Sequence, residues 1–323
     1  MGAEEPGPPP LVAVVVTYNN ERDIVACLGA LVGQLPAAGV VVVVDNDSTD
    51  RTATLVETQF PQVRLIRSSS NVGFARACNR AAAVVGHGDL LFLNPDTEVQ
   101  PGCIEAITDL ARRRPEAGLY GGRALDAEGR FDPRSCWGRP TWWSLACFAT
   151  GLSSALAGSE RFNPEGMGAW RRDRERDVDV ISGCLLLVRR EVWDQLDGFD
   201  EDFFMYGEDA DLAVRAHELG YRPLITPGAV VRHEVGASSP TVDKNVMLFR
   251  GKATLVRKLW PGPEGRVALG LLVAGVGLRA ALAGVARPLL SRLRPGPRTE
   301  ASVWAELWHR RPEWTPGWTG ADR

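Results

Sequence analysis

The sequence predicts an α/β protein with a mostly parallel central sheet, flanking helices and a C-terminal helical tail. Three observations support this class. Short apolar runs alternate with helical patterns through the first part of the chain, which is typical of parallel strands joined by helical crossovers. The 323 residues, 45% of them hydrophobic, suffice for one large domain and an appendage. Polar clusters follow the strands, where such sheets bind their ligands.

The composition argues against some functions. The net charge of −3 disfavours a general nucleic-acid binder, which would carry a basic face. Residues 1–10 are acidic and proline-rich, so we expect a disordered leader rather than a signal peptide or a membrane anchor. The six cysteines are scattered without a C-x-x-C pair, and we expect reduced, mostly buried thiols of a cytoplasmic protein.

Four strands are predicted, at residues 11–16, 40–44, 63–67 and 90–93. The first is a continuous apolar, β-branched run, which is typical of a strand buried on both faces. A helix is expected after each strand. The first should be capped by Asn20 and should bury Ile24, Cys27, Leu28 and Leu31. Residues 130–177 place four tryptophans among Pro, Gly and Arg, so this segment either closes over a substrate or forms a structural insertion. Further strands are expected at 178–188, 223–226 and 229–231.

Three of the predicted strands end in polar clusters, at residues 17–20, 45–50 and 94–96. A single cluster would be ordinary turn chemistry. Three clusters that meet at one edge of a parallel sheet indicate a nucleotide site. Neither G-x-G-x-x-G nor a Walker lysine follows the first strand, which disfavours dinucleotide and P-loop sites.

Residues 198–220 hold the densest group of reactive side chains. Six carboxylates lie between residues 200 and 211, interleaved with Phe199, Phe203, Phe204 and Tyr206. Aromatic rings favour burial whereas unpaired acids oppose it, so we expect packed rings that hold carboxylates at the mouth of a cleft. A capped acidic helix start is the alternative. The pattern from residue 208 is helical, with Leu212, Ala216 and Leu219 on one face, and a helix N-terminus favours ionised acids.

The tail contains a basic segment followed by an apolar one. Residues 267–290 are apolar apart from Arg279 and Arg287. We therefore expect an interfacial helix whose arginines reach the lipid headgroups, with a docked soluble helix as the alternative. A second set of basic side chains is expected to meet anionic headgroups: Arg250, Lys252, Arg257 and Lys258. Residues 292–323 are assigned no fold.

From about residue 12 to 260 the chain resembles a family-2 glycosyltransferase of the GT-A fold, most closely the bacterial rhamnosyltransferases. The resemblance rests on the order and spacing of Thr17-Tyr18-Asn19, Asp45-Asn46-Asp47-Ser48-Thr49-Asp50, Asn71-Val72-Gly73-Phe74, Asn94-Pro95-Asp96, the 198–211 block and His233. It implies a catalytic domain over 11–250, with a donor half to about 125 and an acceptor half from about 126. Residues 251–323 would be a membrane-associated helical tail.

The resemblance also implies roles for residues of the matched motifs. Val16, Thr17 and Tyr18 would shape the nucleoside pocket, and Asp45 and Asn46 would hydrogen-bond the pyrimidine and its ribose side. Asn71 and Arg76 would face the nucleotide or the diphosphate. Asn94-Pro95-Asp96 takes the place of the family's metal-binding D-x-D turn, which leaves Asp96 as the charged ligand. His233 matches a histidine that completes the metal shell in some relatives. Such ligands suit Mg²⁺ or Mn²⁺, and the imidazole slightly favours Mn²⁺.

The reaction implied is inverting transfer of a sugar from a nucleotide-diphosphate donor to an acceptor hydroxyl. A carboxylate must take the hydroxyl proton. The family's Glu-Asp motif assigns this role to Asp209, with Glu208 as the open alternative, and neighbouring acids raise the proton affinity of such a base. Likeness to the subfamily favours dTDP-rhamnose as donor, with UDP-sugars left open. The acceptor implied is a polyprenyl-linked or cell-envelope glycan at the inner face of the plasma membrane. No oligomeric state is indicated.

Two other functions are compatible with parts of the pattern. A sugar nucleotidyltransferase also uses a parallel sheet and metal-held carboxylates, but it normally carries a Gly-rich, Lys/Arg-containing loop after its first strand, and residues 17–23 form no such loop. The other is an inactive sugar-binding relative in an envelope complex. The intact Glu208, Asp209 and Asp96 argue against it.

Overall fold

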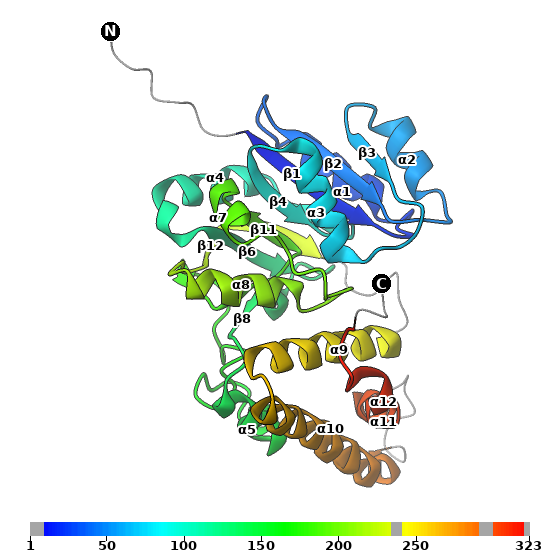
Figure 1. The fold of residues 1–323 in the computed structure, drawn as a ribbon, viewed down its shortest axis with the longest axis vertical. Helices are drawn as coiled ribbons and strands as arrows, with labels where there is room; N and C mark the ends of the chain where they lie inside the picture. The colour runs from blue at the N-terminus through cyan, green and yellow to red at the C-terminus, as the bar shows by residue number, and fades with distance from the viewer. Residues whose placement is uncertain (1–9, 234–240, 291–299, 320–323) are drawn as a thin grey trace.

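The computed structural model describes residues 10–233, 241–290 and 300–319. Figure 1 shows an upper lobe built on a sheet and a lower lobe of helices. The sheet runs in the order β3 (Arg64–Arg67), β2 (Val40–Asp45), β1 (Leu11–Thr17), β4 (Asp89–Leu93), β11 (Leu185–Val188), β6 (Leu119–Leu125), β12 (Leu224–His233), β5 (Thr97–Val99). Short strands β7 (Phe131–Asp132) and β9 (Arg176–Asp177) pair with β6 and β12, and β8 (Cys136–Trp137) pairs separately with β10 (Val180–Ile181).

The α/β class expected from the sequence is confirmed. β1 is parallel to both β2 and β4, and β2 is parallel to β3. Beyond β4 the sheet is mixed, because β11 is antiparallel to both β4 and β6. The two strands expected near residues 223–231 form the single strand β12, whose register against β6 shifts between Ile225 and Val230.

Helices cover both faces of the sheet. α1 (Ile24–Val32), α2 (Thr52–Gln59) and α4 (Cys103–Arg113) pack on one face, while α3 (Phe74–Val85), α7 (Arg190–Gln195) and α8 (Glu208–Glu218) pack on the other. Alternation along each strand supplies both cores, since Val12 and Val14 join one cluster and Ala13 and Val15 the other. α1 buries the four residues expected, and all six cysteines are free and buried.

The cap expected for α1 is wrong. The N-cap position is Asp23, and no side chain caps the helix. Asn20 Oδ1 instead accepts hydrogen bonds from Thr17 Oγ1 at 3.1 Å and from the Tyr18 N–H at 3.0 Å. An asparagine amide competes in this way for nearby backbone donors, so Asn20 shapes the turn that ends β1.

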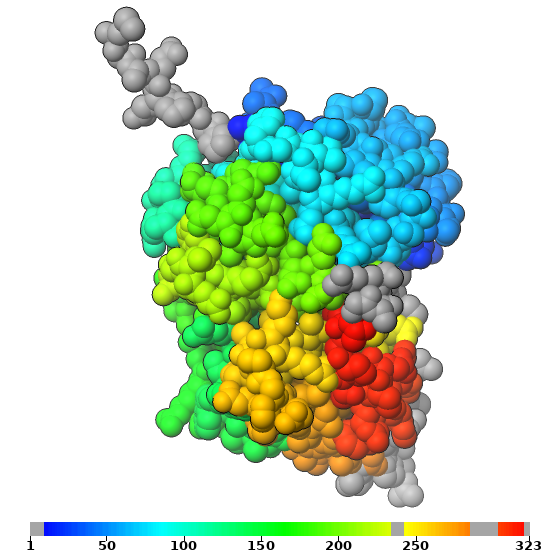
Figure 2. Space-filling view, in the orientation of Figure 1, coloured from blue at the N-terminus to red at the C-terminus, as the bar shows by residue number. Residues whose placement is uncertain are grey.

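The lower lobe combines an insertion with the tail. The insertion supplies α5 (Trp142–Ala149) and α6 (Leu152–Ala155), and the tail supplies α9 (Thr241–Leu259), α10 (Pro263–Leu290), α11 (Glu300–His309) and α12 (Arg311–Trp314). Figure 2 shows the green insertion beside the orange and red tail. Residues 130–177 are thus structural in large part, since α5 packs on α10 and Trp170 is buried. The domain boundary expected at residue 250 falls inside α9 and stays a prediction.

One described helix segment, Pro263–Gly284, is long and apolar enough to cross a membrane by length and composition. The expectation that Arg279 reaches lipid headgroups from this helix is wrong. Arg279 is only 9% exposed, and its guanidinium donates to the carbonyls of Phe148 and Gly275 and to the hydroxyls of Ser153 and Ser154. A buried charge needs such partners, and the insertion provides them. The side chain of Arg287 lies outside the described residues.

The basic residues of α9 each bind a neighbouring segment of the protein. Arg257 donates to the carbonyl of Pro316, and Lys252 pairs with Glu165 at 3.3 Å. Arg250 donates to the carbonyl of Gly317, and Lys258 pairs with two acids near the start of α8. Arg257 and Lys258 remain exposed, and Arg250 and Lys252 are half-buried, so the headgroup role expected for these four residues stays a prediction.

Candidate active site

The carboxyl ends of β1 and β2 form one edge of the site. The Asn46 N–H donates to the Thr17 carbonyl at 2.8 Å, which ties the two strand ends together. One carboxylate oxygen of Asp45 accepts from the Ser48 N–H at 3.3 Å. The other, Oδ1, is buried and has no hydrogen-bond partner among the described residues. Buried polar atoms are normally satisfied, so this oxygen is suited to accept an N–H from a ligand.

Asn46 organises the loop that follows β3. Its Nδ2 donates to Asn71 Oδ1 at 2.8 Å and to the Gly73 carbonyl at 3.2 Å, and its Oδ1 accepts from the Val72 N–H at 3.0 Å. Asn71 also accepts from the Gly73 N–H. The amides of Asn46 and Asn71 therefore hold the 71–73 loop beside the strand ends.

The other predicted donor residues differ in their surroundings. Val16 and Thr17 are buried in β1, whereas Tyr18, which directly follows this strand, is 46% exposed. A ring that stacks on a base needs such exposure. Arg76, in α3, forms an ion pair with Glu201 at 3.3 Å. The Asn94 carbonyl accepts from the Thr97 N–H at 3.2 Å, which closes the turn between β4 and β5.

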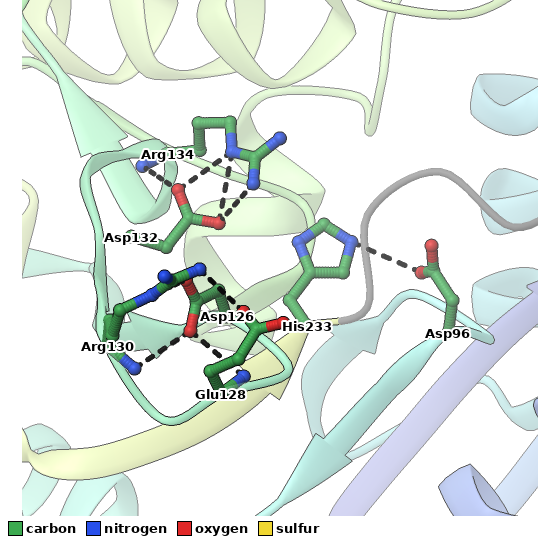
Figure 3. A network of polar contacts seen from close by, with 7 residues as sticks. All are labelled: Asp96, Asp126, Glu128, Arg130, Asp132, Arg134 and His233. Atoms are coloured by element: carbon green, nitrogen blue, oxygen red, sulfur yellow. Dashed lines mark hydrogen bonds and ion pairs between the residues drawn. The ribbon is translucent and has the colours of Figure 1, made fainter. Parts of the chain in front are cut away.

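Asp96 and His233 meet across the gap between the turn after β4 and the end of β12 (Figure 3). Asp96 Oδ1 lies 3.2 Å from His233 Nε2, and both side chains are mostly buried. His233 Nδ1 is buried without a partner among the described residues. Nearby, burial tends to raise the pKa of Asp132, but hydrogen bonds from Arg134 lower it overall. Asp132 therefore stays charged and is already bound to that arginine (Figure 3).

The donor atoms of Asp96 and His233 fit part of a divalent-cation shell. A carboxylate oxygen and an imidazole nitrogen are ligands that Mn²⁺ accepts. No group of three or more His, Cys, Asp or Glu side chains arranged for a metal occurs within residues 10–233, 241–290 and 300–319. Two protein ligands still suffice where substrate phosphates and waters complete the shell, as is usual for Mg²⁺.

Glu208 and Asp209 are the first two residues of α8, and both are buried. Asp209 Oδ2 accepts from the Gly183 N–H at 3.2 Å and Oδ1 from the Ala210 N–H at 2.8 Å. Burial raises the pKa of Asp209, and these N–H groups oppose the rise. Burial and the charge of Asp209 raise the pKa of Glu208, whose Oε2 has no partner within the described chain. Burial therefore raises both pKa values more than the helix N-terminus lowers them. Of the two carboxylates, that of Asp209 is the better fixed, because both of its oxygens accept hydrogen bonds from backbone N–H groups.

The interpretation of residues 198–211 as packed rings that hold acids agrees with the structure. Phe199 and Phe203 are each 1% exposed. Asp211 binds Arg215 at 2.7 Å and Lys258 at 2.6 Å. The capping alternative does not describe this helix start, because the N-cap is Gly207 at φ 105° without a side-chain cap.

The helical face predicted from residue 208 is correct for Leu212 and Ala216, which are buried. It is wrong for Leu219, which is 54% exposed. α8 ends at Glu218 and Leu219 is its C-cap, so the side chain lies past the turn that faces the core.

Sequence reasoning did not find the partners of the acidic segment. Gly183 supplies an N–H to Asp209, and Lys258 and Trp318 contact residues 200–211 from the lower lobe. The small residues of Ser182-Gly183-Cys184 were a signal for close backbone approach. Lys258 and Trp318 gave no signal, because they lie far from the segment along the chain.

A family model described as "Glycosyltransferase like family 2" matches residues 8–248. The N-acetylglucosaminyl-diphospho-decaprenol L-rhamnosyltransferase of Mycobacterium tuberculosis is 34% identical over 261 residues, which cover 76% of this chain and 83% of the relative. The chain belongs to this glycosyltransferase family. An O-antigen biosynthesis protein of Myxococcus xanthus is 31% identical over 71% of this chain, although the match spans only 18% of that protein.

Solved structures agree on the fold of this family-2 glycosyltransferase. A Pyrobaculum calidifontis mannosyltransferase, solved with GDP-Man and Mn²⁺, matches 94% of this chain and 86% of its own with a TM-score of 0.58 at 19% identity. GalNAc-T7, solved with UDP, GalNAc and Mn²⁺, matches 96% of this chain and 55% of its own with a TM-score of 0.54 at 14% identity. These likenesses show the GT-A fold.

Proposed function

We propose that this chain transfers rhamnose, with inversion, from dTDP-rhamnose to a hydroxyl of a polyprenyl-diphosphate-linked sugar. The name of the mycobacterial relative supports both the sugar and the class of acceptor. The observation that carries the chemistry is the buried carboxylate of Asp209, held by the Gly183 and Ala210 N–H groups. A fixed carboxylate of raised pKa is suited to general-base work.

The donor half would bind the nucleotide through the edge formed by β1 and β2. The buried Asp45 Oδ1 would accept the N3–H of the pyrimidine, and the exposed ring of Tyr18 would stack on the base. Asn46 and Asn71, which hold the 71–73 loop, would set the ribose side, and Arg76 would stand near the diphosphate.

Asp96 and His233 would hold a divalent cation, with Asn94 shaping the turn. A bound cation would offset the negative charge that develops on the leaving diphosphate. The Mn²⁺ in the solved mannosyltransferase supports this proposal.

Asp209 would take the proton of the acceptor hydroxyl as its oxygen bonds to the anomeric carbon. The bond from that carbon to the diphosphate oxygen breaks on the opposite side, which inverts the configuration. Glu208 is the alternative base, since it is also buried and of raised pKa. The products are the glycosylated acceptor and the free nucleotide diphosphate, which keeps the electron pair of the broken bond.

Incubation with dTDP-rhamnose, Mn²⁺ and a short polyprenyl-diphospho-N-acetylglucosamine should add one deoxyhexose to the lipid, detected by mass. A thermal-shift screen over dTDP-, UDP- and GDP-sugars should first identify the donor, because a ligand at a hundred times its Kd adds about 2.7 kcal/mol of stability. Diphosphate-dependent synthesis of a nucleotide sugar would instead indicate a nucleotidyltransferase. Donor binding without hydrolysis or transfer would indicate an inactive relative.

We further propose that the protein works at the cytoplasmic membrane surface, and that the outer stripe of α10 contacts the lipid. Between Val267 and Leu282 the exposed residues of this helix follow a helical spacing and carry no charge: Val267, Gly270, Ala274, Ala281 and Leu282. Arg279 faces the opposite side, into the lobe. Exposed Trp142 and Trp143 on the insertion are residue types that favour the interface.

Anionic vesicles should therefore bind the full chain, and carbonate should release it. Replacing Val267 and Leu282 by Asp should abolish vesicle binding in a flotation assay, because both side chains are 59% exposed and would enter the acyl boundary. Leu219→Asp, at a similarly exposed leucine of the upper lobe, is the matched control and should float normally. Resistance to carbonate would favour a spanning helix, and no flotation of the wild type would leave only a docked helix.

A further inference from the structure

Residues 198–207, here called the acidic loop, contact the loop at residues 71–74 and directly precede the candidate base Asp209. In the second half of this loop, the Phe204 carbonyl accepts a hydrogen bond from the Phe74 N–H at 2.7 Å. Gly73 has φ +84°, and a Cβ there would lie 2.4 Å from the same carbonyl oxygen. The acidic loop therefore touches the 71–73 loop, here called the donor loop, so closely that only glycine fits at residue 73. A few residues later the acidic loop leads directly into Glu208 and Asp209.

Trp318, from the lower lobe, packs on the acidic loop. Its Nε1–H donates to the Met205 carbonyl at 3.0 Å, and its ring lies 5.4 Å from the ring of Phe204. Figure 1 shows the red segment after α12 beside α9. Phe204 thus contacts the donor loop through its carbonyl and Trp318 through its ring.

Trp318 is itself fixed by α9. The Trp318 N–H donates to Thr254 Oγ1 at 2.7 Å, and the Arg250 guanidinium lies 4.4 Å from the indole centroid. Gly317 has φ +74°, and a Cβ there would lie 2.8 Å from Thr254 Oγ1. The indole is therefore held on its backbone side and on one face, as a rigid support requires.

Lys258 of α9 holds the two flanks of the acidic loop. Its ammonium binds Asp200 and Asp211, the latter at 2.6 Å, and lies 5.3 Å from the Phe203 centroid. Asp200 lies before Asp209 along the chain and Asp211 after it, so one cation fixes both sides of the base.

We propose that Trp318 is a positioning residue for sugar transfer, and that with Lys258 it locks the acidic loop so that Asp209 and the donor loop keep their relative places. This inference rests on the proposed function. It gives the last described segment of the chain a role at the site, in place of the purely peripheral one expected for the tail. Neither residue takes part in the chemistry, since each acts through Phe204, Met205, Asp200 or Asp211.

The test compares Trp318→Ala with Trp308→Ala in the full chain. Trp308 is also half-buried in the lower lobe, but its contacts are with Gly277 and Arg311 rather than with the acidic loop. Trp318→Ala should lower kcat by about tenfold to a hundredfold, because small misplacements of reacting groups have effects of this size. Trp308→Ala should leave kcat within twofold of the wild-type value at the same temperature.

Amide hydrogen exchange gives a readout that does not need transfer. Trp318→Ala should raise exchange in peptides covering 198–211 and 71–79, and Trp308→Ala should not. Trp318→Phe keeps the stacked ring but loses the N–H, so its kcat should fall between those of Trp318→Ala and the wild type. Lys258→Met should reproduce the exchange pattern over 198–211.

Equal kcat and equal exchange for Trp318→Ala and Trp308→Ala would overturn the proposal and reduce Trp318 to a packing residue. If the wild type transfers no sugar, the proposed function fails. The exchange comparison would still decide whether Trp318 orders the loop.

Discussion

Replacing Asp209 by Asn should lower kcat for sugar transfer by about a thousandfold, within the range expected for loss of a general base. The acceptor hydroxyl would then have no carboxylate to take its proton. The Gly183 N–H bonds one oxygen of Asp209 and the Ala210 N–H the other, so the variant should fold with a small local rearrangement, because an amide accepts at one atom only. Thermal unfolding and nucleotide-diphosphate binding should remain close to wild type.

Glu208→Gln is the discriminating control. Its side chain accepts no hydrogen bond at Oε2 within the described chain, so the exchange of carboxylate for amide should cost much less activity than Asp209→Asn. If Glu208→Gln were the inactive variant and Asp209→Asn kept more than a few per cent of activity, the base would be Glu208.

The pH profile gives a second check on Asp209. Burial raises the pKa of Asp209 above the ordinary value of 3.8. A base works in its deprotonated form, so kcat/KM should be full above the raised pKa and should fall as the pH drops through it. If kcat/KM instead fell only near the ordinary aspartate pKa of 3.8, the raised pKa of the buried Asp209 would be contradicted.

Removal of divalent cations should abolish transfer, and Mn²⁺ or Mg²⁺ should restore it. The physical reason is the charge of the diphosphate leaving group, which a cation held by Asp96 and His233 would offset. Asp96→Ala should raise the Mn²⁺ concentration for half-maximal activity by at least tenfold, or about 1.4 kcal/mol of binding free energy. His233→Ala should raise it less, because it removes a neutral ligand.

Mn²⁺ binding measured by electron paramagnetic resonance in the presence of nucleotide diphosphate separates metal affinity from catalysis. Asp132→Asn is the matched control, because Asp132 lies nearby but is bound by Arg134, and it should leave Mn²⁺ affinity unchanged. Full activity in excess EDTA would refute the metal requirement and would point to a protein cation such as Arg76 at the diphosphate.

Local rules made much of the upper lobe predictable. Continuous apolar runs identified β1, β2 and β4, and the 3.6-residue period of α1 gave its buried side. The polar clusters that follow these strands could also be predicted to lie together, because parallel strands bring their carboxyl ends to one edge of the sheet. The motifs at residues 17–19, 45–50, 94–96 and 208–209 then indicated the family, which the comparisons confirmed.

The surroundings of those motifs were decided by contacts that are distant along the chain. The sequence alone determined that the strands, their polar ends and the acidic segment exist. Only tertiary structure turned Arg279 inward against Phe148, paired Lys258 with acids on both sides of Asp209, and placed Trp318 on Phe204. A charged or aromatic side chain at the surface of an isolated helix has many partners available to it. Its choice depends on which backbone carbonyls, acids and rings the folded lobes bring within a few ångströms, and no local pattern encodes that.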